Sequence, residues 1–132
     1  MLSYKHGYHA GNQADVLKHI CLIQAYKSLK KHHKSISYID THAGSGDYNF
    51  KSDYMSKNKE YENGISKLEN YKYENQSIKF YLKVLRNINN SKKMAFYPGS
   101  PSIISYLSDS SDKLLFYELH NNEVQLLRKH LA

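Results

Sequence analysis

The sequence contains little of what would direct a protein outside the cell or into a membrane. It has a single cysteine, Cys21, which excludes an internal disulfide and favours a reducing compartment. No apolar run approaches the roughly 18 residues of a membrane span, and no charged-then-apolar leader opens the chain. The histidine pairs lack the Cys, Asp or Glu neighbours that would complete a metal site. The sequence therefore predicts a cytoplasmic protein with no metal and no membrane association.

The charge and the aromatic residues favour a polyanionic partner. Nineteen Lys and Arg against twelve Asp and Glu leave a net charge of +7, which is typical of proteins that bind RNA or DNA. The thirteen tyrosines, with no tryptophan, offer rings that could stack on bases. Solvated surface lysines and a tyrosine-rich core are the structural alternatives, so composition leaves both interpretations open.

The most specific local pattern is D-T-H-A-G-S-G, from Asp40 to Gly46, which follows a short apolar run. Its glycines let the backbone approach a ligand closely. A strand that ends in an acid before such a loop is typical of the first strand of a Rossmann-like sheet, where ligands bind beyond the carboxyl ends of strands. Glu118 ends a second apolar run and could accept hydrogen bonds from both ribose hydroxyls. A plain tight turn is the alternative for the loop.

Helical and strand patterns alternate along the chain, which predicts an α/β fold with parallel strands. Apolar spacing and capping residues indicate helices at 12–29, 78–88, 100–107 and from Asn121 or Asn122 onward. Short apolar runs indicate strands or extended segments at 37–40, 94–97 and 114–118. So few strands predict an incomplete sheet.

Two details of this organisation concern the middle of the chain. Ser100 is expected to cap the helix that it begins, with Pro101 at the first helical position. The polar stretch 47–75 is expected to be an insertion rather than part of the core, and a small helical insertion is predicted over about 47–92. The whole chain, residues 1–132, is expected to form part of one domain.

Four segments together are more specific than any of these patterns. They are L-S-Y-K-H-G-Y-H-A-G-N-Q-A-D-V-L-K-H near the start, D-T-H-A-G-S-G, Y-P-G-S-P and E-L-H. Together they resemble the RlmJ-type methyltransferases, which transfer a methyl group from S-adenosylmethionine to N6 of an adenine in 23S ribosomal RNA, and the matches extend to about Leu127. The resemblance implies a Rossmann-like methyltransferase fold, S-adenosylmethionine as cofactor and 23S ribosomal RNA as partner.

The resemblance also assigns roles to individual residues. It places His19, His42, Ser100 and Glu118 in the cofactor site, and Tyr4 and Lys18 in the contact to RNA. The loop 42–46 would present backbone amides to the methionine part of the cofactor, and Ser100 would offer a hydroxyl and free amides to a carboxylate. Glu118 would bind the ribose. Without the resemblance, a lone helical histidine such as His19 would be interpreted as structural.

The catalytic motif of the family, Asp-Pro-Pro-Tyr, does not occur in this sequence, whose two prolines are Pro98 and Pro101. In the family its Asp accepts a hydrogen bond from the adenine amino group, and its aromatic ring stacks on the flipped base. The chain is therefore expected to correspond to the N-terminal part of such a protein, a monomer with no catalytic residue and no activity alone. The alternatives are a non-catalytic nucleic-acid-binding remnant of a truncated gene and a role in the use of external DNA.

Overall fold

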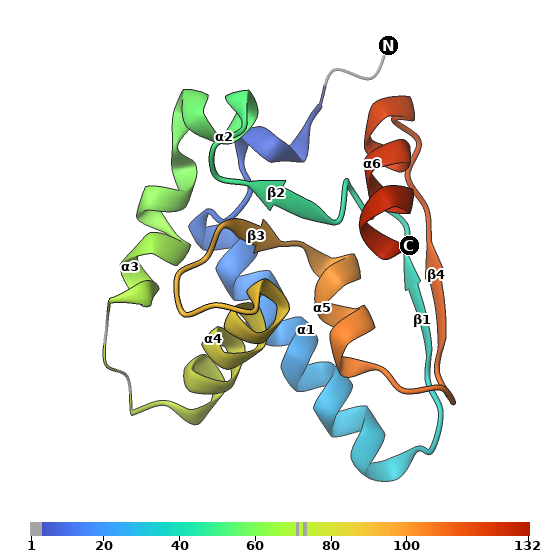
Figure 1. The fold of residues 1–132 in the computed structure, drawn as a ribbon. Coiled ribbons are helices and arrows are strands. Elements are labelled where there is room, and N and C mark those ends of the chain that lie inside the picture. The colour runs from blue at the N-terminus through green and yellow to red at the C-terminus, as the bar shows by residue number, and fades with distance from the viewer. Residues whose placement is uncertain (1–3, 71, 73) are drawn as a thin grey trace.

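The computed structural model describes residues 4–70, 72 and 74–132, which form a mixed α/β structure (Figure 1). Among these residues there are two small two-stranded sheets, and α1, α4 and α5 pack on one another. The elements are η1 His6–Tyr8, α1 Gln13–His32, β1 Ser37–Asp40, β2 Asp47–Asn49, α2 Asp53–Asn58, η2 Glu60–Asn63, α3 Ile65–Glu69, α4 Gln76–Asn89, β3 Phe96–Pro98, α5 Ser100–Leu107, β4 Lys113–Phe116 and α6 Asn121–Leu131.

The strands β1 and β4 pair in parallel, as the alternating pattern predicts, and lie side by side along one side of the molecule (Figure 1). Asp40 at the end of β1 is in register with Phe116 at the end of β4. The pairing continues past the strands, because the Tyr117 amide donates to the Asp40 carbonyl (2.8 Å) and the Ala43 amide donates to the Tyr117 carbonyl (2.9 Å). The segments that follow the two strands are thereby held next to each other.

The second sheet, β2 with β3, is antiparallel and differs from the all-parallel expectation. Gly44 and Gly46 both have positive φ angles, +69° and +89°, which turn the chain back after β1. The Gly46 carbonyl then accepts a hydrogen bond from the Gly99 amide at 2.6 Å, just beyond the end of β3. The loop that the sequence marks as a ligand loop therefore also directs β2 onto β3.

The first helix begins as predicted and is three residues longer. The Asn12 side chain accepts a hydrogen bond from the Asp15 amide (2.9 Å) and caps α1, and the helix runs on to His32. Near its end the Lys30 ammonium pairs with Asp109 (2.9 Å) and Asp112 (3.1 Å) in the segment before β4. These ion pairs tie the end of α1 to the start of the parallel sheet.

The expectation that residues 47–75 lie outside the core is wrong for several of their side chains. Tyr48, Met55 and Ile65 are buried in the same apolar cluster as Ile23 of α1. The local sequence does not indicate this burial, because each of these short elements contributes one buried side chain rather than a continuous apolar face. The predicted helical insertion over 47–92 remains a proposal, since the segment is mostly helical but also contributes to this core.

Three helix or strand ends differ from the sequence expectation. Gly99, not Ser100, is the N-cap of α5, and the Ser100 hydroxyl is bonded elsewhere. His120, rather than an asparagine, precedes α6 as its N-cap. The strand β4 ends at Phe116, so Glu118 lies in the turn beyond the strand. The extra turn residues allow the Glu118 carboxylate to fold back toward the glycine loop.

A substitution at Gly64 tests how closely the segment 59–69 packs on the start of α1. The Ile65 amide donates to the Gly11 carbonyl at 2.9 Å, and a Cβ on Gly64 would collide with that carbonyl and with the Asn12 backbone. Gly64→Ala should therefore lower the free energy of unfolding by about 1–3 kcal/mol in urea denaturation. Asn63→Ala, at an exposed neighbouring position, is the control. Equal unfolding midpoints for the two variants would contradict the close packing.

Candidate ligand-binding site

A pocket of about 520 Å³ opens beyond the carboxyl ends of β1 and β4, within the size range of small-molecule sites. Its walls come from the N-terminal arm, the first turns of α1, the glycine loop, the start of α5 and the turn after β4. All six residues assigned from the family resemblance line it: Tyr4, Lys18, His19, His42, Ser100 and Glu118. The fold thus brings together residues from positions 4 to 118.

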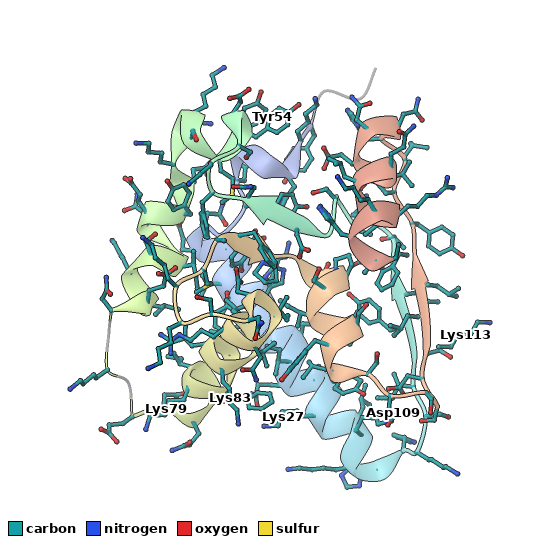
Figure 2. All side chains as sticks on the ribbon, viewed as in Figure 1. Lys27, Tyr54, Lys79, Lys83, Asp109 and Lys113 are labelled. Carbon is teal, nitrogen blue, oxygen red and sulfur yellow. The ribbon has the colours of Figure 1, made fainter. Side chains whose placement is uncertain are left out.

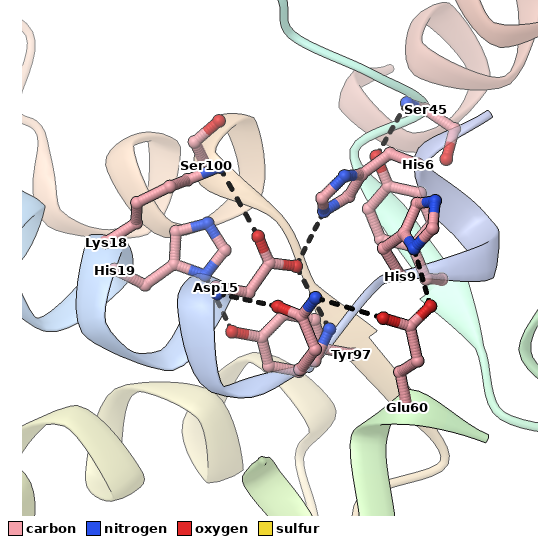
Figure 3. A network of polar contacts seen from close by, with 12 residues as sticks. His6, His9, Asp15, Lys18, His19, Ser45, Glu60, Tyr97 and Ser100 are labelled. Atoms are coloured by element: carbon pink, nitrogen blue, oxygen red, sulfur yellow. Dashed lines mark hydrogen bonds and ion pairs between the residues drawn. The ribbon is translucent and has the colours of Figure 1, made fainter. Parts of the chain in front are cut away.

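A buried carboxylate, Asp15, organises the side of the pocket formed by the arm and α1 (Figure 3). Its Oδ2 is 2.6 Å from Nε2 of His6 and accepts a hydrogen bond from the Gly11 amide at 3.0 Å. Its Oδ1 pairs with the Lys18 ammonium at 3.4 Å. His6 in turn is bonded through Nδ1 to the Tyr4 hydroxyl at 2.8 Å. The two predicted RNA contacts, Tyr4 and Lys18, are therefore both connected to Asp15.

The pKa of Asp15 shows that it remains ionised in this buried position. Burial acts to raise its pKa, but the hydrogen bond and charge of His6, helped by the Gly11 amide, hold the pKa at about 2. A buried carboxylate with these partners fixes the arm on the helix, because leaving it unpaired would be costly.

His19 is buried on α1 and is held by a tyrosine pair. Its Nδ1 is 2.7 Å from the Tyr97 hydroxyl, which lies 2.8 Å from the Tyr81 hydroxyl. Burial lowers the pKa of His19 to about 4, despite the opposing effect of Asp15. The imidazole is therefore neutral at pH 7. The structure gives His19 both a structural partner and a position on the pocket wall.

Glu118 bridges the turn after β4 and the glycine loop. Its Oε2 accepts a hydrogen bond from the Gly44 amide (2.8 Å), and its Oε1 accepts one from the His120 amide (2.9 Å). Position 44 favours glycine over any other residue. Its φ angle is positive, and a Cβ there would collide with the Tyr48 hydroxyl. The carboxylate is fixed in place and each oxygen retains a further lone pair for a ligand.

The expectation that the loop 42–46 offers free amides to a ligand is not met for four of its five amides. The four amides from His42 to Ser45 all donate within the protein, to Asp40, Tyr117, Glu118 and Tyr48 respectively. The Ser100 hydroxyl likewise donates to Asp40 at 2.5 Å. The loop is therefore held by internal bonds, and side chains form much of its contribution to the pocket.

Sequence reasoning missed several residues that line the pocket, namely His6, Tyr48, His120 and Glu123. His120 belongs to the E-L-H segment, so its proximity to Glu118 was visible, and its buried Nδ1 has no hydrogen-bond partner among the described residues. Tyr48 and Glu123 carry no local signal, because β2 and α6 bring them to the pocket only in the folded chain.

Metal binding and membrane crossing can both be assessed for the residues that the structure describes. No group of three or more His, Cys, Asp and Glu side chains among them is arranged to hold a metal ion. Within the same part of the chain, none of the helices combines the length and the apolar character needed to cross a bilayer.

The fold is a mixed α/β structure with a pocket at the carboxyl ends of two parallel strands. Residues 33–132 match the family described as ribosomal RNA large subunit methyltransferase D, RlmJ. The chain therefore belongs to the RlmJ family of ribosomal RNA methyltransferases.

Relatives and a solved structure agree with this assignment. The chain is 40% identical to ribosomal RNA large subunit methyltransferase J of Haemophilus influenzae, over 100% of the chain and 47% of that protein. It is 40% identical to the protein of the same name from Escherichia coli, over 97% of the chain and 46% of the relative. A crystal structure of a Legionella pneumophila protein is 36% identical, with a TM-score of 0.81 over 92% of this chain and 44% of that one. The chain thus spans about half the length of the curated relatives that it matches.

The neutral state of His19 predicts a pH-dependent stability. Its folded pKa of about 4 lies below the usual 6.5, so between these values the unfolded chain binds a proton that the folded chain does not. The free energy of unfolding should therefore fall as the pH drops from 6.5 to 4, by up to about 1.4 kcal/mol per pH unit from this group. Urea denaturation at several pH values measures this slope.

The matched variants are His19→Asn, which has no titrating group, and His32→Asn at an exposed position on the same helix. We expect His19→Asn to reduce the slope and His32→Asn to leave it as in the parent protein. Equal slopes for His19→Asn and the parent would show that His19 is not the group responsible.

Proposed function

We propose that this chain forms the cofactor-binding part of an S-adenosylmethionine-dependent methyltransferase that modifies N6 of an adenine in 23S ribosomal RNA. The observation that carries the proposal is that the six residues assigned from the family resemblance, drawn from separate segments, line a single pocket. A Rossmann-like arrangement, with ligand beyond the parallel strands, is part of the same proposal.

The residues of the pocket suit S-adenosylmethionine, whose role is to supply an activated methyl group. The Glu118 carboxylate, already fixed by two amides, is proposed to accept hydrogen bonds from the ribose hydroxyls. His42 and Ser100 line the same wall and are proposed to contact the cofactor. His19 is neutral at pH 7, so it adds no positive charge next to the cofactor's sulfonium.

The arm and the start of α1 are proposed to contact RNA. Tyr4 is 65% exposed at the pocket and its ring stacks on His9 at a centroid distance of 5.6 Å, which leaves one face accessible for a base. The Lys18 side chain is 66% exposed beside it and can contact phosphate. Tyr4, through His6, and Lys18 are both bonded to Asp15, so the same buried carboxylate positions the proposed RNA contact and one wall of the pocket.

No catalytic residue is assigned to these 132 residues, which contain no Asp-Pro-Pro-Tyr motif. Two of the acids near the pocket already accept hydrogen bonds within the protein. Asp40 accepts hydrogen bonds from the Tyr38 and Ser100 hydroxyls, and Glu118 holds the loop. A second candidate function, RNA binding without methyl transfer, is favoured by the absence of the Asp-Pro-Pro-Tyr motif from the sequence. For both functions we propose that the protein is a monomer that binds RNA in the cytoplasm.

The ribose role of Glu118 is tested by binding of S-adenosylhomocysteine. We expect Glu118→Gln to weaken binding by about 1.5–3 kcal/mol in calorimetry, because a charged acceptor is lost while the shape is kept. Glu62→Gln, an exposed acid in η2, is the control and should bind as the parent does. Unchanged affinity of Glu118→Gln would remove Glu118 from the proposed site.

The missing catalytic motif is tested by methyl transfer. The 132-residue chain should transfer no labelled methyl from S-adenosylmethionine to 23S RNA, because it lacks the Asp-Pro-Pro-Tyr motif that in the family positions the adenine amino group. Transfer should appear when a C-terminal half from a family member, carrying Asp-Pro-Pro-Tyr, is fused after Ala132. Methylation by the chain alone would refute this assignment and require a catalytic residue among those described above.

A further inference from the structure

A second concave surface lies along α4, apart from the residues that line the pocket. It is a groove of about 620 Å³ that we call the α4 groove, lined by Lys79, Lys83, Arg86, Asn87, Asn90, Ser91 and Lys92. Figure 2 shows Lys79 and Lys83 projecting outward from α4. Lys27 of α1 lies nearby, with its ammonium 4.0 Å from the centroid of the Phe80 ring. Every lining residue is cationic or polar.

Within the part of the chain that the structure describes, none of the cations of the α4 groove forms an ion pair, although the Glu69 carboxyl is close enough to act on Arg86 electrostatically. The ion pairs found there involve other cations, and Arg86 donates to the Glu69 backbone carbonyl rather than to a carboxylate. Lys79 and Lys83 are four residues apart on one helix, an arrangement that destabilises a helix through like-charge repulsion.

The helix dipole explains only part of this charge. Arg86 and Lys92 lie at the C-terminal end of α4, where cations are favourable. Lys79 lies in the first turns of the helix, where the dipole disfavours a cation. The groove therefore carries positive charge that folding alone does not require.

The helix that carries the α4 groove is packed on the core and has an aromatic side chain beside it. The opposite face of α4 packs in the core through Tyr81, Leu82, Val84 and Leu85, and this packing holds the helix that carries the exposed cations. At the edge of the groove the Asn87 amide donates to the hydroxyl of Tyr106 at 2.8 Å. Tyr106 is 46% exposed, so its ring is accessible to a base.

We propose that the α4 groove binds the phosphate backbone of RNA, as a second contact separate from the pocket. The lysines and Arg86 neutralise phosphates, the amide and hydroxyl side chains can bond 2′-hydroxyls, and Tyr106 offers a stacking face. A membrane surface fits less well, because interfacial helices bury apolar side chains and no apolar side chain lines this groove. The identity of the RNA as ribosomal rests on the proposed function.

The test is the affinity for 23S RNA of the double variant Lys79→Gln/Lys83→Gln, measured by filter binding over a range of salt. Both side chains are exposed, so the fold is retained. We expect affinity to fall roughly tenfold or more, and the slope of log affinity against log salt to decrease by about 1.5 to 2, as two phosphate contacts are lost. Lys79→Arg/Lys83→Arg, which keeps the charges, should bind as the parent does.

The matched control is Lys113→Gln/Lys129→Gln, which removes the same charge from exposed positions on β4 and α6. Equal losses for the two double variants would show that only net charge matters and would overturn the proposal, as would absence of RNA binding by the parent. Binding to anionic lipid vesicles that depends on Lys79 and Lys83, without their effect on RNA, would also overturn it.

Binding of S-adenosylhomocysteine to the same variants separates this proposal from the proposed function. It should be unchanged by Lys79→Gln/Lys83→Gln, since neither side chain lines the pocket. Failure of the parent to bind S-adenosylhomocysteine, with the groove variants still affecting RNA, would refute the cofactor site and leave the α4 groove in place.

Discussion

The buried carboxylate of Asp15 is the interaction on which the site depends. One carboxylate oxygen is bonded to His6 and accepts from the Gly11 amide, the other pairs with Lys18, and the Asp15 amide donates to the capping Asn12 side chain. An ionised carboxylate in this buried position is stabilised by His6, the Gly11 amide and Lys18, and this pairing holds the arm on α1. That placement sets the positions of Tyr4 and Lys18, while the next turn of α1 carries His19, which is bonded to Tyr97.

Local sequence signals were sufficient where a single segment determines its own structure. The cap at Asn12, the apolar face of α4 and the strand Ser37–Asp40 are all as predicted, because capping, amphipathic spacing and the acid–glycine boundary act within a few residues. The family motifs went further, since they pointed to residues in four segments that the fold brings to one pocket. Neither spacing nor composition alone could join Tyr4 to Glu118.

Features that depend on long-range contacts could not be predicted in this way. The pairing of β2 with β3, the burial of Met55 and Ile65, and the hydrogen bonds of the Ala43 and Gly44 amides all require partners distant in sequence. The same holds for the ionised state of Asp15 and the neutral state of His19, which are set by burial and neighbours rather than by residue type. Such tertiary contacts convert a loop expected to offer amides into one that presents side chains.

The pocket beyond β1 and β4 is proposed to be the cofactor site, with RNA contacts arranged around it. The most direct measurement is a map of backbone amide chemical shifts of the labelled chain during titration with S-adenosylhomocysteine. We expect the largest chemical-shift changes at residues 41–46, at Gly99 and Ser100 and at residues 118–120, with little change along α4. Saturable changes confined to α4, or none at the loop and the turn after β4, would contradict it.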